Sequence, residues 1–175
     1  MLSAEAAAYT KRVCETAVGA GIPVLFDPNV RLKLGSAEAW RDTLADVLQL
    51  VNTLLIGEDE LSLLASGHEP STLLSESTTI VVVKRGNSGA SAYTRHGEVH
   101  APARTVPKID PVGAGDAFNA GWISATLRGL PPEAALREAA VVASFVVAVP
   151  TDTAGLPCAR ERDRALQKDQ YDIDR

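Results

Sequence analysis

Two glycines stand directly before an aspartate at a predicted helix start in residues 110–118, which read DPVGAGDAF. Gly113 and Gly115 can adopt backbone conformations that other residues avoid, and with Ala114 between them they let main-chain N–H groups approach an anion closely. The helix predicted over residues 114–127 adds the unpaired N–H groups of its first turn and the positive end of its dipole. The pattern indicates a phosphate site, although a plain glycine-rich turn entering a helix with an N-terminal Asp has the same letters.

Asp116 lies inside this predicted anion site, where a carboxylate would repel a phosphate. Its presence is better explained if it faces the attacking partner and not the nucleotide. There it would accept a proton from a substrate hydroxyl while the hydroxyl oxygen attacks a γ-phosphoryl group. The sequence therefore favours a base placed beside a phosphate site.

Helical and strand patterns alternate along the chain, which predicts an α/β fold with a parallel sheet and an antiparallel edge. Ser36 is the expected N-cap of one helix. The remaining helices are expected at residues 2–18, 58–65, 114–127 and 132–149, with a short one within 160–175. Strands are expected at residues 22–26, 53–56, 80–83 and 90–94, with another ending at 101, and residues 66–77 are expected to be polar loop. Ligands of parallel sheets bind beyond the carboxyl ends of the strands, which is where Asp27, Gly57, Lys84 and Asp110 fall.

The 110–118 segment resembles the signature of the PfkB (ribokinase-like) carbohydrate kinases, in which an acidic residue, a short spacer, GAGD and Phe follow one another. Other segments match that family in the same order: DPNVR at 27–31, GEDE at 57–60, VVVKRGNSG at 81–89 and TDTAGLP at 151–157. The resemblance covers almost the whole chain, up to about Leu166. Within the family, the chain looks most like the 2-keto-3-deoxygluconate kinases.

The resemblance implies the C-terminal, nucleotide-binding portion of a ribokinase-like (Rossmann-like) three-layer core, in a kinase that uses ATP and Mg2+. It implies that Asp116 is the base and that Gly113, Ala114 and Gly115 form the anion hole. The other implied sites are a nucleotide loop, a set of substrate contacts and an outer-shell Mg2+ residue. The implied nucleotide loop contains Lys84, Gly86, Ser88 and Gly89. The implied substrate contacts are Arg31, Asp116 and Asp152. The implied outer-shell Mg2+ residue is Glu60.

Each of these residues also has a plainer interpretation. Arg31 and Lys33 fit solvated surface charge, Asp152 fits a helix-exit turn, and Glu60 fits a surface helix. The Lys84 region and the Gly86–Gly89 turn fit a simple hairpin. The chain also departs from the family at Thr151, where glycine is usual, and at Gly57, which replaces the asparagine of an NxxE motif. The histidines at 68, 96 and 100 form no convincing ligand pattern.

Composition excludes several classes of protein. A net charge of −5 with dispersed Lys and Arg argues against nucleic acid or anionic membrane as the main partner. Cys14 and Cys158 are too few for a disulfide framework or a zinc site, and we expect reduced thiols in a cytoplasmic protein. The N-terminus does not resemble a signal peptide, and the longest apolar run, residues 139–149, is shorter than a membrane span. The expected partners are ATP and a sugar or sugar acid.

Family members carry the first half of the core and a β-sheet lid, and neither precedes Met1. The chain is therefore expected to be a fragment, a truncated reading frame, or a half that pairs with another chain. An α/β core cut through its sheet exposes a strand edge, which favours association, including a homo-oligomer. Two functions compete: a sugar kinase, acting on 2-keto-3-deoxygluconate or on fructose, ribose or another family sugar, and a catalytically incomplete nucleotide-binding remnant or regulatory module.

Overall fold

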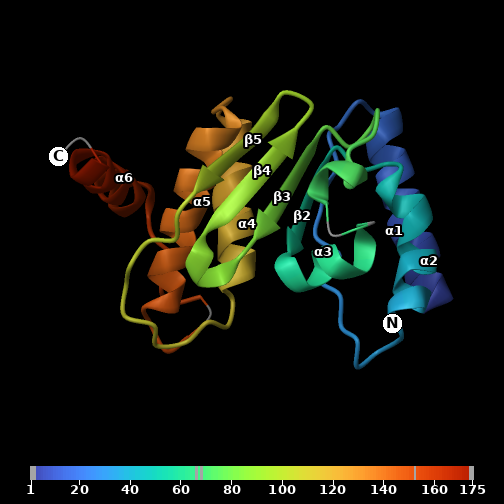
Figure 1. Ribbon diagram of the computed structural model, residues 1–175, viewed down its shortest axis with the longest axis horizontal. Helices are drawn as coiled ribbons and strands as arrows, with labels where there is room; N and C mark the ends of the chain where they lie inside the picture. The colour runs from blue at the N-terminus through green and yellow to red at the C-terminus, as the bar shows by residue number, and fades with distance from the viewer. Residues whose placement is uncertain (1–2, 66, 68, 152, 174–175) are drawn as a thin grey trace. The chain divides into compact units, whose positions relative to one another are not determined.

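The computed structural model describes residues 3–65, 67, 69–151 and 153–173, with side chains described as far as residue 168. Its contacts divide the chain into two units, which can be followed by colour in Figure 1. The first unit comprises Met1–Lys84 and Tyr93–Glu98, and the second comprises Arg85–Ala92 and Val99–Arg175.

Helices alternate with strands in the first unit, as the sequence predicts. In chain order the unit contains α1 (Ala4–Gly19), β1 (Leu25–Phe26), α2 (Ala37–Leu48), β2 (Thr53–Gly57), α3 (Glu58–Leu64), the 3-10 helix η2 (Pro70–Leu73) and β3 (Ile80–Lys84). The second unit is mainly helical, with the 3-10 helix η3 (Gly86–Ser88), α4 (Ala114–Leu127), α5 (Pro132–Val147) and α6 (Ala159–Ile173). The strands β4 (Ala90–Thr94) and β5 (Gly97–Ala101) have residues in both units.

The strands form a mixed five-stranded sheet in the order β1-β2-β3-β4-β5. Its β1, β2 and β3 strands are parallel, with Leu25 opposite Thr53 and Thr53 opposite Ile80. This confirms the predicted α/β fold, and it brings the carboxyl ends of these three strands to one edge. Polar residues that directly follow or end β1, β2 and β3 therefore become neighbours.

Serine caps set the starts of α1 and α2. The Ala6 N–H donates to Ser3 Oγ at 3.1 Å, and the Ala39 N–H donates to Ser36 Oγ at 3.2 Å. Each hydroxyl satisfies an N–H group that has no acceptor within its own helix. The predicted cap at Ser36 is confirmed.

β1 is shorter than the strand predicted for residues 22–26. The Ile22 N–H donates back to Ala17 O at 2.9 Å, which continues the exit of α1, and Pro23 has no N–H to donate. The side chain of Asn52 then accepts from the Val24 N–H at 2.7 Å. A side-chain contact and the helix exit thus replace the first half of the expected strand ladder.

Three other boundaries differ from those predicted. The 66–77 segment is not loop throughout, because Pro70 fixes the φ of the first residue in η2. α5 ends at Val147 and not at residue 149. α6 is a regular helix from Ala159, whose start is stabilised by the Cys158 N–H donating to Glu161 at 2.8 Å. That backbone hydrogen bond lowers the pKa of the Glu161 carboxyl.

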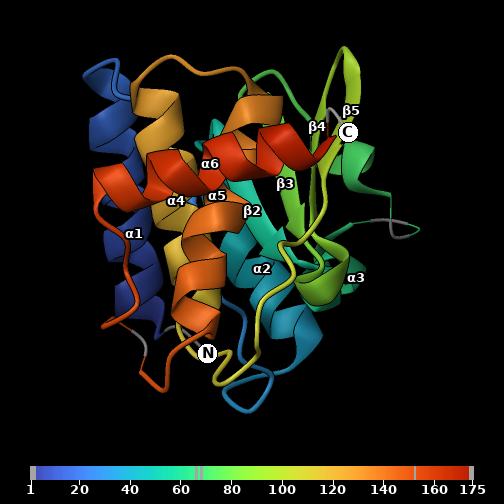
Figure 2. The same cartoon turned by 90° about the vertical axis from the view of Figure 1, so that its left-hand side faces the viewer.

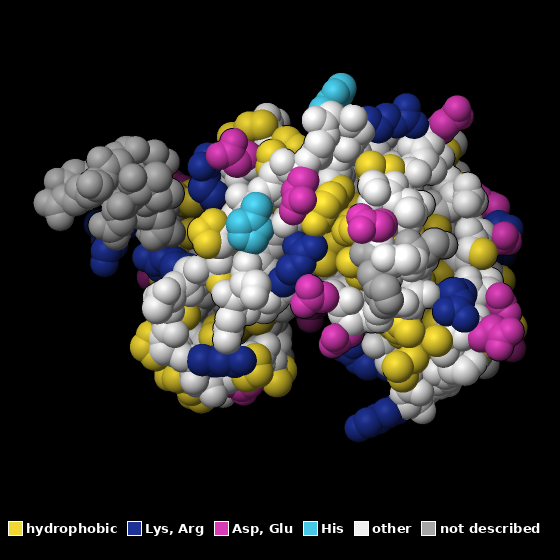
Figure 3. Space-filling model, viewed as in Figure 1, with side chains coloured by type: hydrophobic (Ala, Val, Ile, Leu, Met, Phe, Trp, Pro, Cys, Tyr) yellow, Lys and Arg dark blue, Asp and Glu magenta, His cyan; other side chains and the backbone are white. Residues whose placement is uncertain are grey.

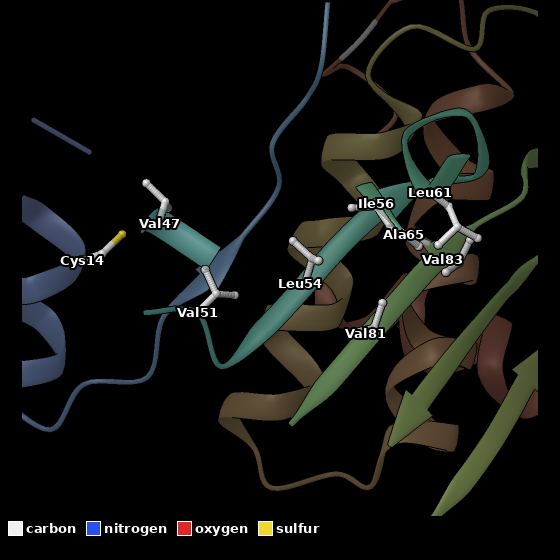
Figure 4. Close-up of a cluster of buried hydrophobic side chains, with 9 residues drawn as sticks. All are labelled: Cys14, Val47, Val51, Leu54, Ile56, Leu61, Ala65, Val81 and Val83. Atoms are coloured by element: carbon white, nitrogen blue, oxygen red, sulfur yellow. The ribbon is translucent and has the colours of Figure 1, made fainter. Parts of the chain in front are cut away.

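The core of the first unit lies on one face of β2 and β3. Figure 4 shows its buried side chains: Cys14, Val47, Val51, Leu54, Ile56, Leu61, Ala65, Val81 and Val83. Both cysteines of the chain are free, and burial raises the pKa of the Cys14 thiol. Cys14 therefore acts as a small apolar residue here.

In the second unit, α4 packs closely against α5 (Figure 2). A Cβ placed on Gly121 of α4 would lie 2.8 Å from the Ala139 Cα of α5, so only glycine permits this approach. Trp122 on the same helix is completely buried. The position of α4 is thus set by a backbone contact together with its largest side chain.

A buried carboxylate joins α6 to this pair of helices. Glu138 of α5 is 1% exposed, and both of its carboxylate oxygens accept from Nη2 of Arg128 at the end of α4. Arg162 of α6 lies 3.4 Å from the same carboxylate and 3.5 Å from the Ser124 hydroxyl. A buried charge is tolerated only when it is paired, and here two guanidinium groups share that task.

Acidic and basic side chains are interspersed over the face drawn in Figure 3. This distribution agrees with the dispersed charges expected from the sequence. Within the described part of the chain, none of the helices combines the length and hydropathy that crossing a membrane requires.

We predict that Arg128→Met lowers the free energy of unfolding by about 2–3 kcal/mol, because the buried Glu138 loses the Arg128 guanidinium and keeps only that of Arg162. The matched control is Arg137→Met, which removes an arginine from the exposed Glu133 pair and should change stability by no more than about 0.5 kcal/mol. Urea denaturation followed by circular dichroism measures both changes. Equal effects of the two substitutions would contradict the role given to Glu138.

Candidate active site

The N-terminus of α4 carries the arrangement that the sequence predicts for an anion site. Asp110 Oδ1 accepts the Val112 N–H at 2.9 Å, which folds the loop, and Gly113 then adopts a left-handed φ of +79°. The Ala114 N–H donates to Pro111 O at 3.2 Å. Among the described residues, the N–H groups of Gly115 and Asp116 have no acceptor. Two adjacent donors at the positive end of a helix are therefore available to an anion.

The loop before α4 is held by α5. The N–H groups of Ile109 and Asp110 donate to the carbonyl of Val147 at 2.9 and 3.2 Å. Since Val147 is the last residue of α5, its carbonyl has no partner inside that helix. One helix end thus orients the loop that opens the next helix.

Asp116 is exposed on the first turn of α4, whereas Ala117 and Phe118 beside it are buried. The helical period places Asp116 on the opposite side from these apolar residues. Its carboxylate has no hydrogen-bond or ionic partner among the described residues. It is accessible to a substrate hydroxyl beside the same turn that offers the open N–H groups.

The Gly86–Ser88 turn, also in the second unit, is closed by its own backbone. The Arg85 N–H donates to Gly89 O at 2.8 Å, and the Gly89 N–H donates to Gly86 O at 3.1 Å. Gly89 has a φ of +85°, and a Cβ there would lie 2.1 Å from Ala101 O. Gly86, Asn87 and Ser88 are exposed. The turn is thus a fixed structure with an open outer side.

The first unit carries the other predicted site residues. Lys84, at the end of β3, donates to Asp27 Oδ2 at 2.7 Å, and both side chains are about four-fifths buried, being 17% and 20% exposed. Asp27 directly follows β1, so the ion pair spans the carboxyl ends of two parallel strands. This pairing was not predicted from the sequence. The one indication of it was that both residues were expected at the carboxyl ends of strands.

Glu60 holds two backbone groups at the same edge. Its Oε1 accepts the Val30 N–H at 2.5 Å, and its Oε2 accepts the Gly57 N–H at 2.7 Å. Arg31 is exposed, and its guanidinium contacts only the carbonyl of Val30, at 3.3 Å, within the described chain. The structure therefore gathers Arg31, Glu60 and Lys84 around one loop.

Several sequence-based assignments stay predictions. Asp152 and His68 lie outside the described residues. The Mg2+ role of Glu60 and the nucleotide role of Lys84 are untested. Within the described residues, no three His, Cys, Asp or Glu side chains gather as metal ligands.

Residues 2–158 match the model of the pfkB family carbohydrate kinases. The chain belongs to this family. It is 33% identical over 162 residues to the 2-dehydro-3-deoxygluconokinase of Bacillus subtilis, and 33% identical over 174 residues to the 2-dehydro-3-deoxygalactonokinase of Haloferax volcanii. These matches cover 89% and 95% of this chain, but 50% and 54% of the two relatives. The PfkB chain thus spans about half the length of these curated relatives.

Fructokinases are similar to nearly the same degree, with 31% identity over 157 residues to the enzyme of Klebsiella pneumoniae, covering 85% of this chain and 51% of that one. Among solved structures, an E. coli protein assigned as a ribokinase II, in complex with ATP and Mg2+, superposes with a TM-score of 0.87 at 29% identity. That match covers 95% of this chain and 55% of the other. The ribokinase-like fold expected from the sequence is confirmed.

We predict that Gly89→Ala destabilises the chain by at least about 2 kcal/mol, because its Cβ would meet the Ala101 carbonyl in a backbone conformation that alanine avoids. Gly86→Ala is the control. Gly86 also has a positive φ, of +52°, but a Cβ on Gly86 would have no atom within 4 Å, so the cost should be about 1 kcal/mol. Thermal denaturation compares the two. A cost at Gly86 as large as that at Gly89 would show that φ alone governs the turn.

Proposed function

We propose that this PfkB chain provides the phosphate site and the general base of an ATP-dependent sugar kinase. The observation that carries the proposal is the first turn of α4. There the open N–H groups of Gly115 and Asp116 follow the left-handed Gly113, and the exposed Asp116 carboxylate lies on the same turn. Open N–H groups and an exposed carboxylate thus lie within one helical turn, which supports the proposal.

The reaction follows from these two groups. Asp116 accepts the proton of a sugar hydroxyl, and the hydroxyl oxygen forms a bond to the γ-phosphorus of ATP. The bond from that phosphorus to the bridging oxygen breaks, and ADP leaves with the electron pair. The N–H groups at the start of α4 stabilise the negative charge on the phosphoryl oxygens during the transfer. Asp116 then releases its proton to water.

A nucleotide fits the α4 turn because backbone N–H groups at a helix N-terminus bind phosphate without a cationic side chain. Mg2+ is compatible with the absence of a ligand cluster in the described residues, since Mg2+ keeps several waters and binds largely through substrate phosphates. When bound, it would neutralise phosphate charge. Glu60 is the residue proposed for an outer-shell contact. The Gly86–Gly89 turn, with Ser88 and Lys84, is proposed for the nucleotide side.

For the sugar we propose a 2-keto-3-deoxy sugar acid such as 2-keto-3-deoxygluconate. Its support is Arg31, an exposed guanidinium without a carboxylate partner in the described chain, since a planar fork suits a carboxylate. The identity to sugar-acid kinases adds to this support. Asp152 is proposed as an acceptor for sugar hydroxyls. Fructose is the alternative to be tested, since fructokinases are almost as similar.

We predict that Gly113→Ala weakens binding of a non-hydrolysable ATP analogue about tenfold. Alanine disfavours a φ of +79°, so the N–H groups of the turn would no longer point toward the phosphate. Gly129→Ala is the matched control, since Gly129 has a φ of +75° just beyond the other end of α4. It should cost similar stability and leave affinity unchanged. Titration calorimetry on the 175-residue chain measures both. If the parent and Gly113→Ala bind the ATP analogue with equal affinity, the nucleotide binds elsewhere on the chain.

We predict that Asp116→Asn lowers kcat by about a hundredfold or more and changes nucleotide affinity little, since asparagine keeps the shape but cannot accept the proton. ATP-dependent phosphorylation of 2-keto-3-deoxygluconate and of fructose is measured with the chain alone. It is measured again with the N-terminal half of the Bacillus subtilis relative added. Asp163→Asn, on exposed α6, is the control. Nucleotide binding without turnover in either mixture would favour the alternative of a regulatory or remnant module.

A further inference from the structure

The loop that follows β1 is held at almost every residue, although it has no regular secondary structure. Asp27 Oδ1 accepts the Asn29 N–H at 3.0 Å, and Trp40 Nε1 of α2 donates to Arg31 O at 3.2 Å. Between them, the Val30 N–H donates to Glu60 of α3. Pro28 is buried. Three helices or strands outside the loop, namely α2, α3 and β3, therefore fix its path.

The loop also stores an unfavourable backbone conformation. Asn29 has a φ of +46°, and it is the only described residue other than glycine with a positive φ. Asparagine tolerates this region better than most residues, but the conformation still costs free energy. It persists because the hydrogen bonds on both sides determine the chain direction. Strain of this kind is retained where the surroundings over-determine it.

The carboxylates of Asp27 and Glu60 and the ammonium of Lys84 make most of the side-chain contacts that fix the 27–31 loop. Asp27 and Lys84 neutralise each other in a site that is about four-fifths buried. Glu60 uses one oxygen on the loop, at Val30, and the other on the end of β2, at Gly57. Burying these charges costs desolvation energy, which short charged hydrogen bonds offset. The result is a loop joined to the carboxyl ends of β1, β2 and β3 together.

Arg31 emerges from this fixed loop as its exposed charge. Its carbonyl is held by Trp40, whereas its guanidinium reaches only the neighbouring Val30 carbonyl among the described residues. A fixed backbone with an open guanidinium is preorganised for an anion, because less conformational freedom is lost on binding. If the 27–31 loop were mobile, Arg31 would bind that anion more weakly, because the loop would have to become ordered on binding.

We infer that Asp27, Glu60 and Lys84 are positioning residues that hold the 27–31 loop so that Arg31 meets the carboxylate of the sugar acid. This inference rests on the proposed function for the identity of the ligand. It gives Lys84 and Glu60 a role on the sugar side, in addition to the nucleotide and Mg2+ roles proposed above. The two kinds of role predict different results when either residue is changed.

The first measurement needs no ligand. Amide hydrogen exchange of Asn29 and Val30 is followed in the 175-residue chain and its variants. Lys84→Met should raise both exchange rates about tenfold or more, because Asp27 loses the hydrogen bond from the Lys84 ammonium. Lys84→Arg should restore most of the protection. Lys33→Met, which removes an exposed cation from the next segment, is the matched control and should leave both rates unchanged.

The second measurement separates the two roles by affinity. Titration calorimetry compares 2-keto-3-deoxygluconate, fructose and an ATP analogue with Mg2+. Lys84→Met and Glu60→Gln should weaken sugar-acid binding about tenfold, as Arg31→Met does, and change fructose affinity less than about twofold. Lys84→Arg should recover sugar-acid affinity. A merely destabilised variant would lose all three ligands together.

Specific results overturn the inference. If Lys84→Met or Glu60→Gln weakens nucleotide or Mg2+ binding and spares the sugar acid, those residues belong to the nucleotide side. If Arg31→Met abolishes sugar-acid binding while Lys84→Met does not, the proposed substrate stands and the positioning role is wrong. If the parent chain binds no sugar acid, the proposed ligand fails for this chain. The exchange rates of Asn29 and Val30 then decide alone whether the three residues hold the loop.

Discussion

The close approach of α4 to α5 at Gly121 is the constraint on which the first turn of α4 depends. Because a side chain at that position would meet the Ala139 backbone, the two helices can lie together only with glycine there. The last carbonyl of α5, on Val147, also accepts the N–H groups of the loop before α4. α5 thus fixes both the body of α4 and the chain that enters it. The packing of α4 against α5 therefore orients the N–H groups of the first turn of α4. The loop before α4 is held by its contacts with α5.

Four carboxylates in the described chain stabilise backbone N–H groups. Asp27, Glu60, Asp110 and Glu161 each accept at least one main-chain N–H, in loops or at helix starts. A carboxylate used in this way is already solvated by the protein and is less available for proton transfer. Asp116 differs, since no partner holds its carboxylate in the described chain. The open carboxylate of Asp116 agrees with the proton-acceptor role proposed for it.

The parts of the fold that follow from local rules could be read from the sequence. The serine cap at Ser36, the helix beginning at Ala114 and the buried strand at β3 depend on residues near them in the chain, and each is found as predicted. The pairing of Asp27 with Lys84 and the sharing of Glu138 by two arginines join residues far apart in sequence. Neither has a periodic or spaced signal, because the partners meet only after the strands and helices have packed. A distant contact also contributes to the wrongly predicted start of β1, where the Asn52 side chain accepts the Val24 N–H.

Gly57 contributes a backbone contact to the site although it has no side chain. It stands where the family motif has asparagine. The structure shows that Glu60 accepts the main-chain N–H of Gly57, a group that every residue except proline provides. A Cβ at this position would lie 3.5 Å from Glu60 Oε2, an ordinary van der Waals distance. The hydrogen bond from the main-chain N–H at position 57 to Glu60 therefore does not depend on the side chain at that position. What the replacement removes is only what an asparagine amide would add beyond that backbone contact.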